Sequence, residues 1–337
     1  MDFTAAYIDM RVGNPAEEKP LMLEQLLFCP VIVWVCKELL CHGVGRLFVV
    51  CDKAWKEETE RVLSSFGAVQ VSTDAEAARA EAGECAVITG ALLPVDGDEE
   101  IFGWLPVETR AELFAAAPYC RDEICARLAR QGVTFIDPHT TYIDPRAVIG
   151  AGTVVLPGTI IRGESVVGAC CEIGPNSMIR DCRVGDHTTV NASQINESTI
   201  GSHATVGPFA YVRPGCTVGD RCRIGDFVEL KNSVLGEGTK VSHLTYVGDS
   251  DVGCRVNFGC GTVTTNYDGR KKFRCSVGDD AFLGCNTNLI APVRVGDGAY
   301  TAAGSTITED VPDGALALAR PRQENKLGWA KRFFGKK

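Results

Sequence analysis

The sequence predicts a parallel β-helix in its C-terminal part, preceded by a reduced α/β domain. From Ile149 to Thr264 and again from Val277 to Ile307 a mostly aliphatic residue recurs at every sixth position, with five-residue steps at a few corners. Val, Ile or Leu occupies 24 of the 27 positions of this ladder, and Gly follows 15 of them. This pattern is typical of hexapeptide repeats, which wind into a β-helix. The composition, with 36 Gly and 7% aromatic residues, also favours a repetitive architecture.

Residues 1–98 are expected to form the α/β domain. The apolar patterns predict strands at 4–9, 46–51, 68–72 and 85–89 and helices at 31–41, 55–66 and 74–82. This alternation favours a parallel sheet. The segment after the first strand, 9–15, has one Gly, a Pro and no Gly-rich phosphate motif. We therefore expect no nucleotide chemistry from this domain.

The rest of the chain divides into a linker, the repeat and a tail. Residues 99–131 form the linker, because 106–130 has helical periodicity. In the repeat domain, residues 132–319, three hexads make one triangular coil, and coils stack roughly 4.8 Å apart. The tail, residues 320–337, has seven Lys or Arg against one Glu. It fits a contact with an acidic ligand as well as it fits a solvated end.

Charge and cysteine content argue against several classes of protein. The 34 Lys and Arg against 43 Asp and Glu, a net charge of −9, give no overall nucleic-acid footprint. The most apolar stretch, 21–40, carries charged residues and makes a poor membrane span. We find no secretory signal and no zinc spacing among the 16 Cys. We expect a cytoplasmic protein with reduced, mostly buried cysteines.

Two cations share one column of the predicted coil. Arg213 and Lys231 are 18 residues apart, and each follows an inward aliphatic residue. Their charged groups can therefore converge on one anion. Arg162 and Arg180 occupy the same corner, so a basic residue at this position is not diagnostic by itself.

One histidine, His243, is predicted to have polar neighbours near these cations. His243, Tyr246 and Asn257 are expected close to Lys231 and to the polar segment between Thr264 and Val277. An imidazole in such a setting is suited to act as a general base at neutral pH. The other candidates, among them His139, His187 and His203, are interpreted as surface or structural histidines.

These motifs carry a resemblance to a known family. Arg213-Pro-Gly, Phe227-Val-Glu-Leu-Lys231, Ser242-His-Leu-Thr-Tyr246, Asn266-Tyr-Asp-Gly269 and Lys272-Phe273 resemble the acetyltransferase half of the bifunctional N-acetylglucosamine-1-phosphate uridyltransferase/glucosamine-1-phosphate acetyltransferase, GlmU. The match runs from about Arg110 to Arg332. It implies a left-handed β-helix, an exception to the usual crossover hand. It also implies a homotrimer with sites between subunits.

The resemblance implies an activity and a set of site residues. The activity is N-acetylation of glucosamine-1-phosphate by acetyl-CoA, without a metal, in the biosynthesis of UDP-N-acetylglucosamine for the cell wall. His243 removes a proton from the attacking amine. The implied amino-sugar phosphate ligands are Arg213, Lys231, Tyr246, Asn257 and Lys272. The implied acetyl-CoA contacts are Cys260, Asn266, Tyr267, Cys285, Ala303 and Arg320, with Cys285 where relatives commonly have Ser.

The N-terminal domain departs from the family. Lys19-Pro-Leu-Met-Leu23 and Pro30 resemble nucleotidyltransferase elements, but Leu21 occupies the position of a motif Lys. Gly90-Ala-Leu-Leu93 stands where the family has a metal-binding Asp. This implies a degenerate nucleotidyltransferase-like domain that has lost uridyl transfer. Three alternatives stay open: another amino-sugar acceptor, residual UDP-N-acetylglucosamine pyrophosphorylase activity, and a non-catalytic scaffold homologue.

Overall fold

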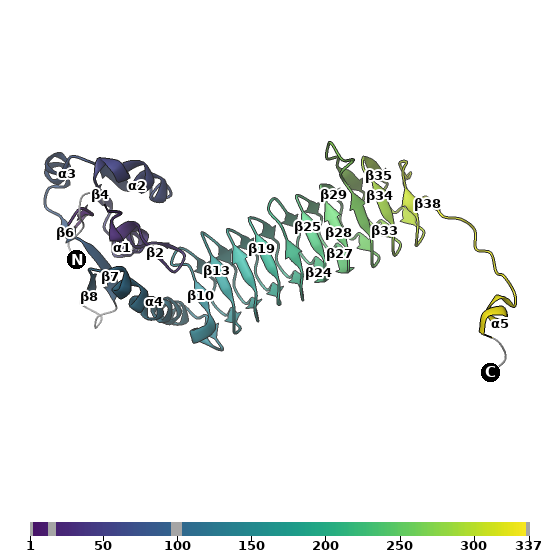
Figure 1. Cartoon of the computed structure of the whole chain (residues 1–337), viewed down its shortest axis with the longest axis horizontal. Helices are drawn as coiled ribbons and strands as arrows, with labels where there is room; N and C mark the ends of the chain where they lie inside the picture. The colour runs from purple at the N-terminus through teal and green to yellow at the C-terminus, as the bar shows by residue number, and fades with distance from the viewer. Residues whose placement is uncertain (1–2, 13–17, 96–102, 335–337) are drawn as a thin grey trace. The chain divides into compact units, whose positions relative to one another are not determined.

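The computed structural model describes residues 3–12, 18–95 and 103–334. Its contacts group into two compact units, Met1–His203 and Ala204–Lys337. The first unit contains the α/β region and the first coils of the repeat, and the second contains the remaining coils and the tail (Figure 1). The coils in each unit consist of short parallel strands, as the ladder predicts.

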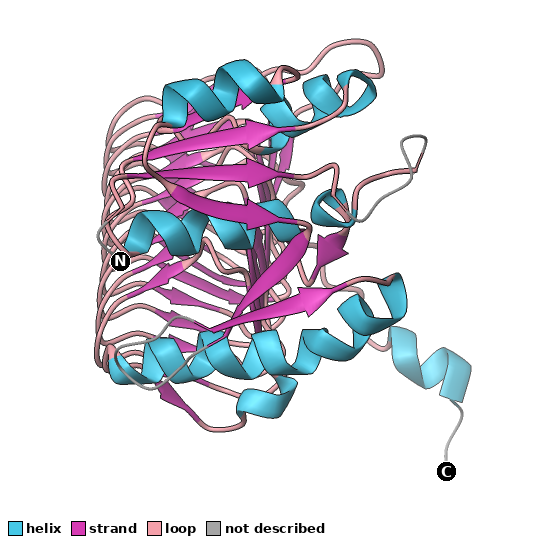
Figure 2. Cartoon of the chain, turned by 90° about the vertical axis from the view of Figure 1, so that its left-hand side faces the viewer, coloured by secondary structure: helices cyan, strands magenta, loops and turns pink. Residues whose placement is uncertain are grey.

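The α/β region contains the predicted parallel sheet. Its strands, in the order β5-β4-β1-β6, are β5 (Val69–Ser72), β4 (Arg46–Val50), β1 (Ala5–Asp9) and β6 (Ala86–Thr89). The accompanying helices are η1 (Leu21–Leu23), α1 (Val31–Cys41), η2 (Lys53–Trp55), α2 (Lys56–Val62) and α3 (Ala75–Ala82). Figure 2 shows these helices beside the strands, and α3 packs on β1 and β4.

Three local features of this region differ from the sequence-based expectation. Helix α2 ends at Val62, because the Ser64 hydroxyl donates to the Arg61 carbonyl and Phe66 N–H to the Leu63 carbonyl, which closes a turn. Strands β2 (Gln25–Leu26) and β3 (Cys29–Pro30) pair antiparallel. An antiparallel hairpin of β7 (Ala91–Val95) and β8 (Gly103–Val107) takes the first residues of the predicted linker helix.

Helix α4 (Arg110–Arg130) leads into the repeat. Thr109 caps it, accepting a hydrogen bond from Glu112 N–H at 3.2 Å. The helix contacts the first coil at β10 (Tyr142–Ile143) and at η3 (Pro138–Thr140), where the Arg121 guanidinium donates to the His139 carbonyl at 2.9 Å. It thereby covers part of an end whose strand edges would otherwise be open.

In the first unit the coils form three parallel sheets with strand partners 16 to 20 residues apart, as in Arg183↔Thr199 and Thr134↔Val154. One sheet contains β9 (Thr134–Phe135), β12 (Val154–Val155), β15 (Glu172–Ile173) and β18 (Thr189–Val190). Another contains β10 (Tyr142–Ile143), β13 (Ile160–Arg162), β16 (Met178–Arg180) and β19 (Gln194–Asn196). The other contains β11 (Val148–Ile149), β14 (Val166–Val167), β17 (Arg183–Val184) and β20 (Thr199–Ile200).

The second unit repeats this pattern. Its first sheet contains β21 (Thr205–Val206), β24 (Arg223–Asp226), β27 (Lys240–His243), β30 (Asn257–Phe258), β33 (Phe282–Leu283), β36 (Tyr300–Thr301) and β38 (Leu316–Ala317). Its second sheet contains β22 (Tyr211–Val212), β25 (Glu229–Lys231), β28 (Tyr246–Gly248), β31 (Val263–Thr265), β34 (Asn288–Ile290) and β37 (Thr306–Ile307). Its third sheet contains β23 (Thr217–Val218), β26 (Val234–Leu235), β29 (Ser250–Val252), β32 (Cys275–Val277) and β35 (Val293–Val295).

The ladder residues fill the interior, and the second inward position explains many of the cysteines. Ladder residues such as Ile161, Ile179 and Leu230 are fully buried. The residue two positions earlier is generally buried too, and it is usually small. Cysteines hold this position at Cys171, Cys182, Cys216, Cys222 and Cys275. All sixteen cysteines lie within the described residues and are free thiols, most of them buried, as the sequence predicts.

Two segments leave the coils. Residues 266–274, called here the site loop, run from β31 to β32 and fold back through a bridge between Tyr267 and Lys272. The Asp268 carboxylate accepts the Arg270 and Lys271 N–H groups, so this polar segment forms the expected turn. The tail ends in α5 (Trp329–Phe334). Among the described helices, none is both long and apolar enough to span a bilayer.

Candidate active site

The predicted base lies at the corner that ends the first sheet of the second unit. His243 is the last residue of β27, and its register partner on β24 is Asp226. The imidazole Nδ1 lies 2.5 Å from Asp226 Oδ1, and both side chains are more than a third exposed. The hydrogen bond from His243 lowers the pKa of the Asp226 carboxyl below its ordinary value. The histidine is thus held through one ring nitrogen while the other nitrogen stays available.

Three predicted acetyl-CoA residues continue this corner. The register Lys240↔Asn257, Phe258↔Leu283 and Leu283↔Thr301 sets Cys260, Cys285 and Ala303 level with His243 on successive coils. Backbone hydrogen bonds of 2.8 Å from Asn286 N–H to the Cys260 carbonyl and from Gly304 N–H to the Cys285 carbonyl lie along the same line. We call Asp226, His243, Cys260, Cys285 and Ala303 the His243 column.

Arg320 lies beside the far end of this column. A Cβ placed on Gly304, the residue after Ala303, would be 3.7 Å from Arg320 Cδ. The residues Cys260, Cys285, Ala303 and Arg320, which the sequence comparison connects only by family resemblance, therefore follow one edge of the prism.

The predicted phosphate ligands lie on the adjacent second sheet. Arg213 follows β22, and Lys231 ends β25, where the register sets it on the next coil. Each cation already has a carboxylate partner. Arg213 Nη1 lies 2.9 Å from Glu229 Oε1, and Lys231 Nζ lies 2.7 Å from Asp249 Oδ2. The two pairs differ in burial, because the first is about 40% exposed whereas Asp249 is only 6% exposed.

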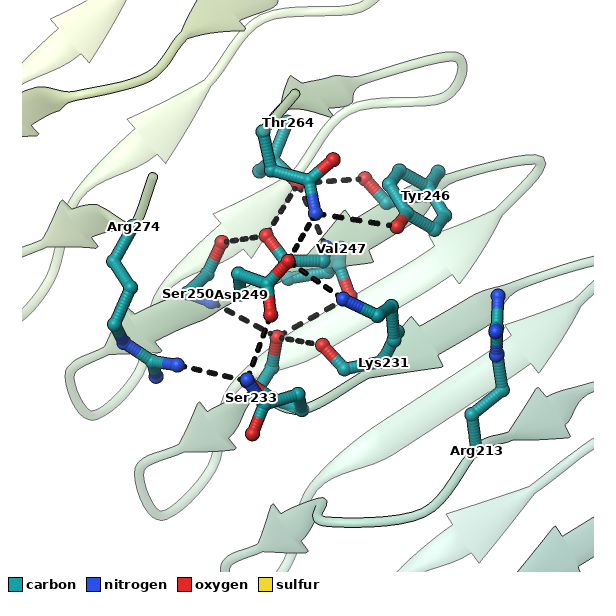
Figure 3. Close-up of polar contacts among 12 residues, drawn as sticks. Arg213, Lys231, Ser233, Tyr246, Val247, Asp249, Ser250, Thr264 and Arg274 are labelled. Atoms are coloured by element: carbon teal, nitrogen blue, oxygen red, sulfur yellow. Dashed lines mark hydrogen bonds and ion pairs between the residues drawn. The ribbon is translucent and has the colours of Figure 1, made fainter. Parts of the chain in front are cut away.

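Asp249 organises the corner between the second and third sheets (Figure 3). Its carboxylate accepts hydrogen bonds from Lys231, from Asn232 Nδ2 at 2.6 Å and from Asn266 Nδ2. Burial raises the pKa of this carboxyl, but the three hydrogen bonds outweigh burial and hold the pKa below its ordinary value. Figure 3 shows Arg213 on its own coil, apart from this cluster.

Tyr246 completes this face of the second sheet. Its ring lies over Gly248, since a Cβ there would overlap the phenol. The phenolic oxygen accepts a weak hydrogen bond from Asn266 Nδ2 at 3.5 Å. Asn266, expected as an acetyl-CoA contact, thus joins Tyr246 and Asp249 rather than the His243 column.

The remaining predicted residues lie further from this cluster. Asn257 is level with Lys240 at the start of its strand, three residues before the level of His243, so the fold of one chain does not bring it to Tyr246. The Tyr267 hydroxyl donates to the Gly269 carbonyl within the site loop at 2.7 Å. Lys272 is exposed on that loop.

Sequence reasoning missed the three carboxylates of the site, Asp226, Glu229 and Asp249. A usable signal exists for two of them: Asp226 is 17 residues before His243, and Asp249 is 18 residues after Lys231. The first separation is one coil, and the second is one coil plus one residue, because the register partner of Lys231 is Gly248. In the described part of the chain, no three His, Cys, Asp or Glu side chains gather so that they could hold a metal ion.

Comparison with known proteins agrees with the fold and with the resemblance inferred from the motifs. The profile of the bacterial transferase hexapeptide (six repeats) matches residues 197–232 and 274–309. A bifunctional protein GlmU from Exiguobacterium sp. is 54% identical over 226 residues, which cover 67% of this chain and 50% of the relative. GlmU from Brevibacillus brevis is 47% identical over 281 residues, or 83% of this chain and 59% of the relative.

Among solved structures, an Arabidopsis UDP-N-acetylglucosamine acyltransferase is 17% identical, with a TM-score of 0.45, over 53% of this chain and 70% of that one. The chain spans about half the length of the curated relatives it matches. The expected left-handed hand of the parallel β-helix is confirmed. The chain thus carries the bacterial transferase hexapeptide repeat and is related, over about two thirds of its length, to bifunctional GlmU.

Proposed function

We propose that this protein is a glucosamine-1-phosphate N-acetyltransferase that uses acetyl-CoA and produces N-acetylglucosamine-1-phosphate for UDP-N-acetylglucosamine biosynthesis. The observation that carries the proposal is the position of His243. One ring nitrogen of His243 is bound to Asp226. His243 lies at the corner between the first sheet, along whose edge the His243 column runs, and the second sheet, which bears Tyr246, Lys231 and Arg213. A general base therefore lies between a surface for a donor and a surface for an anionic acceptor.

The acetyl donor lies along the His243 column. Three coil steps of about 4.8 Å separate His243 from Ala303, and the intervening side chains, Cys260 and Cys285, are small. An extended thioester can follow this edge with its acetyl group at His243. Arg320, at the far end, is suited to meet phosphate groups of the donor.

The acceptor phosphate is held on the second sheet. A sugar phosphate is a dianion, so more than one cation is needed to bind it. The exposed Arg213–Glu229 pair contributes little to stability, and Arg213 can turn to a phosphate at small cost. Lys231 is fixed by the buried Asp249 and supplies a charge of set position. Lys272 and Asn257 contribute from the site loop and from β30, by resemblance.

The reaction needs a neutral amine and a place for its proton. As the amine nitrogen attacks the thioester carbonyl carbon, His243 Nε2 takes the proton that the nitrogen loses. Collapse of the tetrahedral intermediate breaks the C–S bond. The thiolate leaves with the proton returned by the imidazolium, which yields the amide and the free thiol of coenzyme A. Binding both substrates in one orientation supplies much of the rate enhancement.

The assembly and the N-terminal domain complete the proposal. By resemblance, the protein acts in the cytoplasm as a homotrimer in which residues of neighbouring subunits, such as Asn257, complete each site. The α/β domain has lost uridyl transfer, because it lacks the Gly-rich phosphate loop.

An assay of coenzyme A release tests the function. With acetyl-CoA, glucosamine-1-phosphate should give rapid release, whereas glucosamine without the phosphate should be a poor acceptor. Equal rates with both acceptors would favour a different amino-sugar substrate. Absence of release together with no binding of acetyl-CoA by calorimetry would favour the scaffold alternative and contradict the proposal.

A further inference from the structure

The side chains of Asp226 and His243 are held in a fixed relative position although both are exposed. Asp226 and His243 are register partners on adjacent coils, and their backbones are locked by the Leu244 N–H to Asp226 carbonyl hydrogen bond at 2.9 Å. The Thr245 hydroxyl donates to the His243 carbonyl at 2.6 Å and fixes the turn that follows. The corner backbone therefore holds the two side chains face to face.

The contact with Asp226 determines which ring nitrogen of His243 carries the proton in the neutral imidazole. An ionised carboxylate only accepts hydrogen bonds, so the proton in the contact belongs to His243 Nδ1. A neutral imidazole carries one proton, and its Nε2 is then an acceptor. In water, free imidazole side chains prefer the opposite tautomer, with the proton on Nε2. The contact thus selects the tautomer that a base acting through Nε2 requires.

We propose that Asp226 is a positioning residue that holds His243 as the Nδ1–H tautomer and aims Nε2 at the acceptor amine. This inference rests on the proposed function for its catalytic meaning. A purely structural role is a weaker explanation, because ion pairs at such exposure contribute little to stability. The residue level with His243 on the next coil is Cys260, and the residue level with Asp226 on the preceding coil is Pro208; neither adds a charge beside the pair.

Steady-state kinetics of three variants test the role. Asp226→Asn and Asp226→Ala should lower kcat by about 10- to 100-fold, in line with the loss of orienting partners of other histidines. The KM values for both substrates should change less than about twofold, and Asp226→Glu should recover part of kcat. The control is Asp280→Asn, which removes a similarly exposed carboxylate paired to Arg255 and should leave kcat unchanged. Wild-type kcat in Asp226→Ala would overturn the proposal.

A measurement without turnover separates this proposal from the function itself. NMR of the ring nitrogens in protein labelled with ¹⁵N-histidine distinguishes the two neutral tautomers, and His243→Gln identifies the His243 signals. The wild type should show Nδ1–H at His243, and Asp226→Ala should shift it towards Nε2–H, with an unchanged thermal unfolding transition. An Nε2–H tautomer in the wild type would refute the contact whether or not the protein acetylates glucosamine-1-phosphate. An inactive wild type that shows Nδ1–H would refute the proposed function and leave the positioning of His243 supported.

Discussion

At the residue scale, the site is a set of paired charges rather than a cluster of free cations. Lys231 is fixed by the buried Asp249, whereas Arg213 pairs with the exposed Glu229. The buried Lys231–Asp249 pair holds a charge in position. Removing one partner of such a pair lowers the free energy of unfolding considerably, because the other charge is left buried and unpaired. The proposed acceptor surface thus combines a fixed cation, Lys231, with a movable one, Arg213.

His243 should carry the largest catalytic effect of any single residue. His243→Ala removes the acceptor for the amine proton, and we expect kcat to fall by about 10²- to 10⁴-fold. The measurement is the rate of coenzyme A release, with circular dichroism to check the fold. His203→Gln is a matched control, because His203 stacks on His187 in the first unit and is not among the residues assigned to catalysis or to a substrate. An equal loss in both variants would contradict the assignment of the base.

Asp249 should make stability depend on pH. Its pKa is lower in the folded protein than the ordinary value of 3.8, so the folded state binds fewer protons than the unfolded state. The stabilisation is fully present above about pH 5 and is lost as the pH falls through the lowered pKa. Urea unfolding should show Asp249→Asn less stable than the wild type at pH 6, with a gap that narrows below pH 3.8. A gap that is constant with pH would show that the carboxylate charge contributes nothing.

At the element scale, glycine decides how closely the coils and side chains approach. A Cβ at Gly225, beside Asp226 on β24, would overlap the backbone of Ser242 on β27. At Gly248 the overlap would be with the Tyr246 phenol, the movable end of a side chain. The two positions therefore have different consequences for an added methyl group.

Substituting these two glycines should separate stability from binding. Gly225→Ala should destabilise the protein by about 1–3 kcal/mol, because a strand must shift. Gly248→Ala should change stability by less than about 1 kcal/mol and raise the KM for the acceptor, because Tyr246 is displaced. Thermal unfolding and acceptor kinetics measure these effects, with Gly67→Ala, where a Cβ meets nothing within 4 Å, as the control. Equal stability of Gly225→Ala and Gly67→Ala would refute the backbone overlap.

At the scale of the whole molecule, we expect the coils of the repeat and the α/β region to differ in function. Each coil contacts mainly its neighbours, so the repeat is a quasi-one-dimensional scaffold on which sites lie along edges. The α/β region keeps the parallel sheet and helices of its class, but its first strand leads to no Gly-rich phosphate loop.

This difference predicts a negative result in one assay. Incubation with UTP, a divalent cation and N-acetylglucosamine-1-phosphate should release no pyrophosphate above the rate without protein, because the sequence after the first strand carries no Gly-rich phosphate motif. The same preparation should be active in acetyl transfer. Pyrophosphate release that scales with protein concentration would overturn the assignment of this domain as degenerate.

The fold could be predicted almost fully from the sequence, and the site only in part. The ladder predicts which residues are inward, and one coil of 17 or 18 residues predicts the stacking of Arg213 on Lys231 and of Val247 on Leu230, as the register confirms. The sequence does not predict the hairpin of β7 and β8, because each of its strands contains a proline, Pro94 and Pro106, which weakens a strand prediction. Strand β7 also packs against α1, a contact between segments far apart in the sequence.

The sequence by itself determined the architecture, because in a stacked coil the neighbours of every residue are set by a constant separation along the chain. Only the tertiary structure decided which carboxylate meets which charged group. Outward side chains at the corners are not constrained by the ladder. Their partners depend on the number of residues in each coil and on how each corner turns. Asp226 therefore pairs with His243, and Asp249 accepts hydrogen bonds from both Lys231 and Asn266. The hexad pattern alone does not predict these contacts.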